Sequence, residues 1–434
     1  MKYLMNYYFI KSKGDIDLNK KYIICGKFFD GINEVLEEDV KIIVEGELIA
    51  TVGKDLQCPE DAEVIDLSHL TVTPGLIDSH VHIDFSDSRT LATYTFTDSD
   101  EMKTLNTVYC ANKTLLGGFT TVRTMGSAFF GFGQMDAKRA IDRGMFPASR
   151  LIVAPHALNI SGGHWDFSQY TSSNPFLSEM MEKEYASVGN GVDRCKSMVR
   201  KQFKYGADYI KIMAAGGFSS PGDSPVNPQF DNDEVKAIIE TTNSYGSYVA
   251  AHAYTAETIE NLINLGVKEI EHGSLLQEST AKLMEEKGTR FVCTFSPYED
   301  VIQNDEEKLA LKSECFKSKL KIYKDQLINS RQIMKQMIMD KKVLIGYGSD
   351  IVTVYQNYDN WIEFRCWRDG GIPALRTLVA ATSDNAKIIQ RPDLGSLEPG
   401  KIADIAAWSS DIIEDHEALR VCDFVMKEGK IFKQ

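Results

Sequence analysis

The stretch TPGLIDSHVHIDF, from Thr73 to Phe85, places two of the chain's eight histidines, His80 and His82, one residue apart in an apolar segment. In a β-strand, residues i and i+2 point to the same face, so the two imidazoles project together, roughly 7 Å apart along the strand. Imidazoles at this spacing can converge on one metal ion. Two packed or exposed histidines would explain the pair equally well, so its meaning depends on the other strands.

The centre of the chain alternates between apolar strand candidates and helical stretches. The eight strand candidates are 75–83, 119–125, 150–155, 208–214, 247–254, 268–273, 290–295 and 342–350. The helical stretches include 101–116, 192–206, 232–246, 255–266 and, after the eighth strand, 373–389. Eight such repeats predict an α/β protein with a parallel (β/α)8 (TIM) barrel. An open doubly wound sheet is the alternative, but no Gly-x-Gly-x-x-Gly follows a strand, which disfavours its dinucleotide-binding form.

Both ends of the chain have a different character. Residues 20–72, 397–408 and 423–434 carry short apolar runs broken by turn residues, which is typical of β-structure. These stretches predict one small sheet domain assembled from both termini. The segment 300–341 is strongly charged, and it predicts a long solvated helix or a pair of helices before the eighth strand.

Composition excludes several classes of function. The chain has 434 residues and a net charge of −14, which argues against a nucleic-acid partner because phosphate binding needs a basic face. The eight cysteines are scattered and never form Cys-x-x-Cys, so neither a zinc knuckle nor a disulfide framework is predicted. No stretch approaches the ~20 apolar residues of a membrane helix, and no signal-peptide cleavage pattern is found. We therefore expect a soluble cytoplasmic protein without a membrane partner.

Other polar side chains fall late in the strand candidates. They are Lys211 in YIKIMAAGG, His252 in VAAHAY, His272 in IEHGS and Asp350 in IGYGSD. Each has an ordinary structural explanation: a satisfied core histidine, a lysine in an ion pair, or an aspartate that caps a helix. Active sites of (β/α)8 barrels lie at the C-terminal ends of the strands, so the shared position of these residues favours one functional site.

Longer motifs surround these residues: TVTPGLIDSHVH, GFTTVRTMGS, ISGGHWD, GADYIKIMAAGG, AHAYTAETIENLINLGVKEIEHGS, GSD and LGSLEPGKIADIAAW. With these motifs the chain resembles the amidohydrolase superfamily, in the group whose two metals are bridged by a carboxylated lysine. The stretches GGHWD and AHAYT look most like the imidazolonepropionase-related branch, which holds metal-dependent Xaa-Pro and related dipeptidases. The resemblance covers nearly everything from residue 20 onward. It implies a hydrolase barrel of residues 74–390 beside a composite β-sandwich of residues 1–73 and 391–434.

The resemblance also implies a ligand set for two divalent ions. His80 and His82 would bind the more buried ion, and His252 and His272 would bind the second. Imidazole and carboxylate ligands suit zinc, with manganese or iron as alternatives.

A carboxylated lysine would join the two ions in this scheme. Lys211, modified by CO2, would bridge them as a carbamate, and Asp350 would complete the first site. Carbamate formation requires a neutral amine, which burial promotes by lowering the pKa of a lysine.

The implied reaction is hydrolysis of a C–N amide bond by a hydroxide that bridges the metals, which lower the pKa of bound water toward ~7. Asp350 would accept the hydroxide proton and deliver it to the leaving nitrogen. His164, in the Gly-rich stretch SGGHWD, is a candidate contact for the scissile carbonyl or the oxyanion, and a structural loop histidine is the alternative. Tyr254 is a candidate contact for a substrate carboxylate or carbonyl, or else a core aromatic residue.

Three functions follow from this comparison. The leading one is a dipeptidase, similar to Xaa-Pro dipeptidases, or an N-acyl-amino-acid hydrolase, acting on a small amide substrate. The second is a hydrolase of cyclic amides, like the imidazolonepropionases. The third, from another class, is a metal-free scaffold, which the retention of all six ligand positions disfavours. Self-association into a homo-oligomer is a further possibility, since relatives of this type often self-associate.

Overall fold

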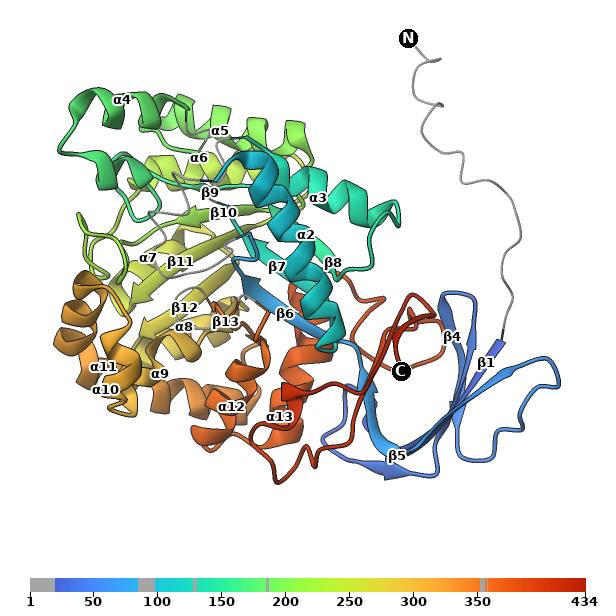
Figure 1. Cartoon of the computed structure of the whole chain (residues 1–434). Helices are drawn as coiled ribbons and strands as arrows, with labels where there is room; N and C mark the ends of the chain where they lie inside the picture. Colours follow the sequence, from blue (N-terminus) through green and yellow to red (C-terminus); the bar gives the residue numbers. More distant parts are fainter. Residues whose placement is uncertain (1–19, 85–97, 128–130, 185–186, 352–355, 357) are drawn as a thin grey trace, which may run out of the picture.

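The computed structural model describes residues 20–84, 98–127, 131–184, 187–351, 356 and 358–434. Figure 1 shows a body of strands surrounded by helices, and beside it a sheet that holds the N-terminal strands and the C-terminus. No helix within the described ranges is long and apolar enough to cross a membrane. All eight cysteines lie in these ranges as free thiols, and most of them are buried.

The body contains a strand at each of the eight predicted positions. These strands are β6 (Leu76–Val81), β7 (Phe119–Met125), β8 (Arg150–Ala154), β10 (Ile210–Met213), β11 (Val249–Thr255), β12 (Glu269–Leu275), β13 (Arg290–Cys293) and β14 (Ile345–Tyr347). They run parallel in the order β6-β7-β8 and, in a second sheet, β9-β10-β11-β12-β13-β14. The sequential order and parallel pairing agree with a (β/α)8 arrangement.

The hydrogen-bonded ladder has a gap at each of two places among the described strands. The third strand stops after β8 and resumes as β9 (Ala157–Leu158), because Pro155 lacks an N–H for the ladder. Between β14 and β6, the backbone N–H of Asp350 donates to the carbonyl of His80 at 2.8 Å. This bond brings the end of the eighth strand against the His-x-His stretch.

Helices follow the strands and cover their outer side (Figure 1). Their bounds are α2 (Asp100–Leu116), α3 (Gly133–Asp142), α4 (Pro175–Glu184), α5 (Val192–Tyr205), α6 (Asn232–Asn243), α7 (Ala256–Leu265), α8 (Glu278–Lys287), α9 (Ser296–Ile302), α10 (Glu306–Ala310), α11 (Glu314–Asp340), α12 (Trp361–Asp369), α13 (Ala374–Val379) and α14 (Asn385–Ile388). Several ends follow from single residues. Ser99 caps the start of α2, since its hydroxyl accepts from the N–H of Met102. Gly206 and Gly266, both with positive φ, cap the ends of α5 and α7.

A third sheet, outside the body, joins both ends of the chain. Its strands are β1 (Lys20–Phe28), β2 (Glu37–Glu38), β3 (Lys41–Glu45), β4 (Leu48–Gly53), β5 (Glu63–Pro74), β15 (Ile405–Trp408), β16 (Phe424–Lys427) and β17 (Lys430–Lys433). The C-terminal strand β15 pairs antiparallel with β5, so N-terminal and C-terminal strands share one apolar core. The boundaries 1–73, 74–390 and 391–434 stay a prediction.

The charged segment before the eighth strand differs in part from the expectation. It contains the short helix α10 and the long helix α11, but α11 is not solvated on all sides. Phe316, Leu320 and Leu327 are buried in one cluster with Phe218 and Tyr254. The apolar residues on one side of α11 pack inward, and two of its charged residues are turned inward as well, Lys319 at 14% exposure and the buried Arg331.

Candidate metal centre

Four imidazoles from three of the parallel strands gather in one place. His80 lies in β6, His82 just after it, His252 in β11 and His272 in β12. The ring centroid of His80 lies 5.7 Å from that of His82 and 4.5 Å from that of His272, and the rings of His252 and His272 are 4.6 Å apart. All four residues are buried. The structure thus brings together histidines that are up to 192 positions apart in the chain, as His80 and His272 are.

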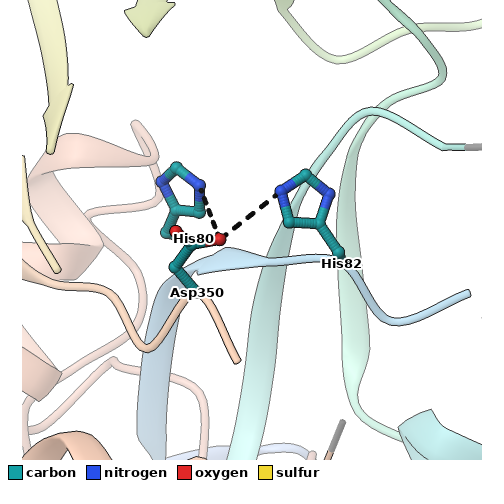
Figure 2. A group of neighbouring side chains, drawn as sticks. All are labelled: His80, His82 and Asp350. Carbon is teal, nitrogen blue, oxygen red and sulfur yellow. Dashed lines mark ion pairs between the residues drawn. The ribbon is translucent and has the colours of Figure 1, made fainter. Parts of the chain in front are cut away.

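The carboxylate of Asp350 enters this group from the loop after β14. Its Oδ1 lies 3.6 Å from Nε2 of His80 and 3.6 Å from Nε2 of His82, as Figure 2 shows. One donor atom from each of these three residues lies within 4.8 Å of the others, a spacing at which they could hold a metal ion. Nδ1 of His272 is also 3.6 Å from Oδ2 of Asp350.

The backbone is strained at two of these positions. Asp350 has φ of 44° and His272 has φ of 70°, in the left-handed region that residues other than glycine seldom adopt. Strain of this kind is concentrated at functional sites, where the surrounding structure holds the residue in place.

Lys211 lies in β10 and is fully buried. Among the residues that the structure describes, its Nζ has no hydrogen-bond partner. Burial lowers the pKa of Lys211 to about 8, while the charges of Glu271 and Asp350 raise it. A buried amine without a partner is costly, so Nζ of Lys211 is an unsatisfied donor among the described residues. Imidazoles and a carboxylate are donor types that divalent cations accept, and His80, His82 and Asp350 are spaced so that they could hold one such ion.

A chain of buried charges lies behind His80. Its Nδ1 is 2.7 Å from Oε2 of Glu271, and the other carboxylate oxygen, Oε1, accepts from Arg123 at 2.9 Å. Arg123 also pairs with Glu269, which in turn lies 2.9 Å from Arg290. Because a carboxylate only accepts hydrogen bonds, Nδ1 of His80 carries the proton and Nε2 keeps its lone pair toward Asp350.

The sequence prediction did not include this network. Two features of the sequence could have pointed to this network: an arginine inside the apolar stretch FTTVRTM, and two glutamates two positions apart in KEIEHG. Buried charges of this kind require partners. A single sequence, however, does not show that Arg123 and Glu271 belong to each other.

Burial also determines the protonation state of the other imidazoles. It lowers the pKa of His82 to about 3 and the pKa of His252 and His272 well below the ordinary value. These rings are therefore neutral at pH 7, the state in which imidazole binds a metal. Nδ1 of His272 is also fixed by the hydroxyl of Thr294, at 3.0 Å.

The two predicted substrate contacts lie beside the cluster. The ring of His164 stacks on that of His252, with centroids 4.7 Å apart and an angle of 26°. The ring of Tyr254 lies 4.7 Å from His252 and 5.4 Å from His272. Its hydroxyl accepts from the hydroxyl of Tyr298 at 3.3 Å, so Tyr254 is held by a buried neighbour as well as bordering the site.

The chain is similar to several known proteins. A family model described as the amidohydrolase family matches residues 71–432. A solved Xaa-Pro dipeptidase with methionine bound in its active site is 30% identical, with a TM-score of 0.83, covering 96% of this chain and 100% of the other. A solved prolidase in complex with N-methylphosphonate-L-proline is 28% identical, with a TM-score of 0.81 and coverage of 96% and 100%. Ochratoxinase from Aspergillus niger is 27% identical over 95% of this chain and 86% of the relative.

Proposed function

The chain belongs to the amidohydrolase family, and we propose that it hydrolyses the amide bond of a dipeptide or an N-acyl amino acid with the help of two divalent metal ions. Family membership makes it an enzyme that acts on carbon–nitrogen bonds. The observation that carries the finer proposal is the convergence of His80, His82 and Asp350. The buried amine of Lys211, which finds no hydrogen-bond partner in the described part of the chain, supports it.

Six side chains would hold the metals. They are His80, His82, Lys211, His252, His272 and Asp350. We propose zinc as the metal, because neutral imidazoles and carboxylates suit it, and we propose that CO2 modifies Lys211 to a carbamate. The neutral amine that this modification requires is favoured by burial, which lowers the pKa of Lys211 to about 8. When bound, the metals would polarise the scissile carbonyl and lower the pKa of a water molecule.

The protein residues would move the proton and orient the substrate. Asp350 would take a proton from the attacking water and pass it to the leaving nitrogen, acting first as base and then as acid. Its position within 3.6 Å of two imidazoles supports this role, because it places the carboxylate at the centre of the cluster. His164 and Tyr254, whose rings both border His252, would contact the substrate carbonyl or carboxylate.

The substrate class is supported by similar proteins that align over almost the whole chain. They include the Xaa-Pro dipeptidase, and the prolidase that was solved with a proline-containing phosphonate. A site of the same family and fold is suited to a small amide that releases a C-terminal amino acid, and proline is the first candidate for that amino acid.

A substrate panel tests the proposal. The purified protein is loaded with zinc and bicarbonate and assayed against Xaa-Pro and other dipeptides, N-acyl amino acids, and cyclic amides such as hydantoins. We expect turnover in the first two groups. Turnover of cyclic amides alone would contradict the dipeptidase proposal and favour an imidazolonepropionase-like reaction. Less than one bound metal per chain and no activity on any compound would favour a non-catalytic scaffold.

A further inference from the structure

The ring of His164 rests on the loop that follows β10, residues 214–231. A Cβ atom at Gly217 would lie 1.9 to 2.4 Å from atoms of this ring, so the imidazole packs directly on the glycine backbone. The backbone N–H of His164 donates to Oε1 of Gln229 at 3.1 Å. The place of His164 therefore depends on the shape of this loop.

A polar chain within the loop fixes the imidazole itself. Nδ1 of His164 lies 2.8 Å from Oγ of Ser220, and this hydroxyl donates to the carboxylate of Asp223. A serine hydroxyl has one proton, and in Ser220 this proton is used in the hydrogen bond to Asp223. The oxygen of Ser220 is therefore the acceptor toward His164, and Nδ1–H of His164 is the donor. This arrangement leaves Nε2 as the ring nitrogen that is available to a substrate.

Helix α11 supplies the ammonium group of Lys319, which binds the same loop. Nζ of Lys319 donates to the carbonyls of Gly217 at 2.8 Å and Ser220 at 2.6 Å, and it lies 3.4 Å from Oδ1 of Asp223. The side chains of Lys319 and Asp223 are only 14% and 6% exposed. A charge pair with so little exposure is screened weakly by solvent, and loss of one partner leaves the other buried and uncompensated.

We propose that Lys319, Asp223 and Ser220 are positioning residues that hold His164 in the orientation needed for the substrate. Lys319 ties the loop backbone to α11, Asp223 orients the hydroxyl of Ser220, and Ser220 orients the imidazole. This gives the helix of the segment 300–341 a role at the active site. The inference rests on the proposed function in one respect, namely that His164 contacts the substrate.

The first arm of the test does not require activity. Hydrogen–deuterium exchange is measured on the full-length protein and on the variants Lys319→Met, Lys319→Arg and Lys317→Met. Lys317 lies on the same helix but pairs with the exposed Glu314, so its variant is the matched control. We expect faster exchange of the loop 214–231 in Lys319→Met, partial recovery in Lys319→Arg and no change in Lys317→Met. Unchanged exchange in Lys319→Met would overturn the role of Lys319.

The second arm tests the link to His164 by a double-mutant cycle. Misplacement of a contacting group by about 1 Å can cost about 100-fold, so Asp223→Asn and Ser220→Ala should each lower kcat/KM by about 10- to 100-fold. In a His164→Asn background the same changes should lower it by less than about twofold, because coupled residues are not additive. Full effects in that background would overturn the positioning role. An inactive wild-type protein with the expected exchange pattern would instead refute the proposed function and leave the loop assignment standing.

Discussion

Nδ1 of His80 lies 2.7 Å from Oε2 of Glu271, while its Nε2 faces Asp350 at 3.6 Å. One ring nitrogen is thus occupied by a buried carboxylate, and the other is left for a metal. Glu271 is itself held by Arg123 at 2.9 Å. Partners of this kind fix the tautomer and orientation of a ligating histidine.

Removal of the charge on Glu271 should weaken metal binding without removing a ligand. The amide of Glu271→Gln can offer its NH2 group to His80, which permits the wrong tautomer. We expect the zinc affinity to fall by about 10- to 100-fold, measured by competition with a chelator. Glu285→Gln, at an exposed site, is the control and should bind zinc as the wild type does. Equal affinities for both variants would contradict the role of Glu271.

Asp350→Asn should remove proton transfer while leaving the fold intact. General acid–base catalysis contributes about 10²- to 10⁴-fold, so kcat should fall by that amount on any substrate that the wild type accepts. Circular dichroism and the melting temperature would show whether the variant is folded. A folded Asp350→Asn enzyme with a kcat within about threefold of the wild type would rule out the proposed proton transfer.

Lys211→Ala should lose bound metal and activity together, because no carbamate can form. The truncation leaves space where the buried amine stands, and a short carboxylate such as formate or acetate could supply two oxygens there. We expect added formate to restore part of the activity and part of the metal content of Lys211→Ala. In the control variant Asp350→Asn, formate should raise neither the activity nor the metal content. Full metal occupancy of Lys211→Ala in the absence of formate would show that the ions do not need Lys211.

Gly217→Ala should displace the ring of His164, since a methyl group would lie 1.9 Å from its nearest ring atom. We expect kcat/KM to fall by about 100-fold with little change in bound zinc. Gly53→Ala, where the added methyl meets only ordinary contacts with Leu56, is the control and should change neither quantity. Unaltered kinetics of Gly217→Ala would mean that the position of His164 does not matter for the reaction.

Much of the barrel could be predicted from local sequence patterns. All eight strand candidates contain a strand, because short apolar runs between helical stretches mark buried parallel strands. The interruption of the third strand at Pro155 and the buried face of α11 were not predicted. The first depends on how a proline is placed in the ladder, and the second on which tertiary neighbours a charged helix meets.

The candidate site divides in the same way. The sequence singled out four histidines and Asp350 as polar residues in or just after apolar strands, and Lys211 as a lysine inside one, because the ends of parallel strands meet at one side of the fold. Their roles as metal ligands came from the resemblance to a family and stay a prediction. The supporting pairs could not be recognised, because Arg123 and Glu271 are 148 positions apart and Asp223 and Lys319 are 96 apart. Nothing in a single sequence connects residues at such separations.

The metal content of the purified protein tests the central claim most directly. Elemental analysis after loading with zinc and bicarbonate should give about two ions per chain, and the double variant His80→Asn/His82→Asn should lose at least one of them while remaining folded. Less than one ion per chain in the wild type, or the same content in the double variant, would contradict the assignment of these residues as the metal centre.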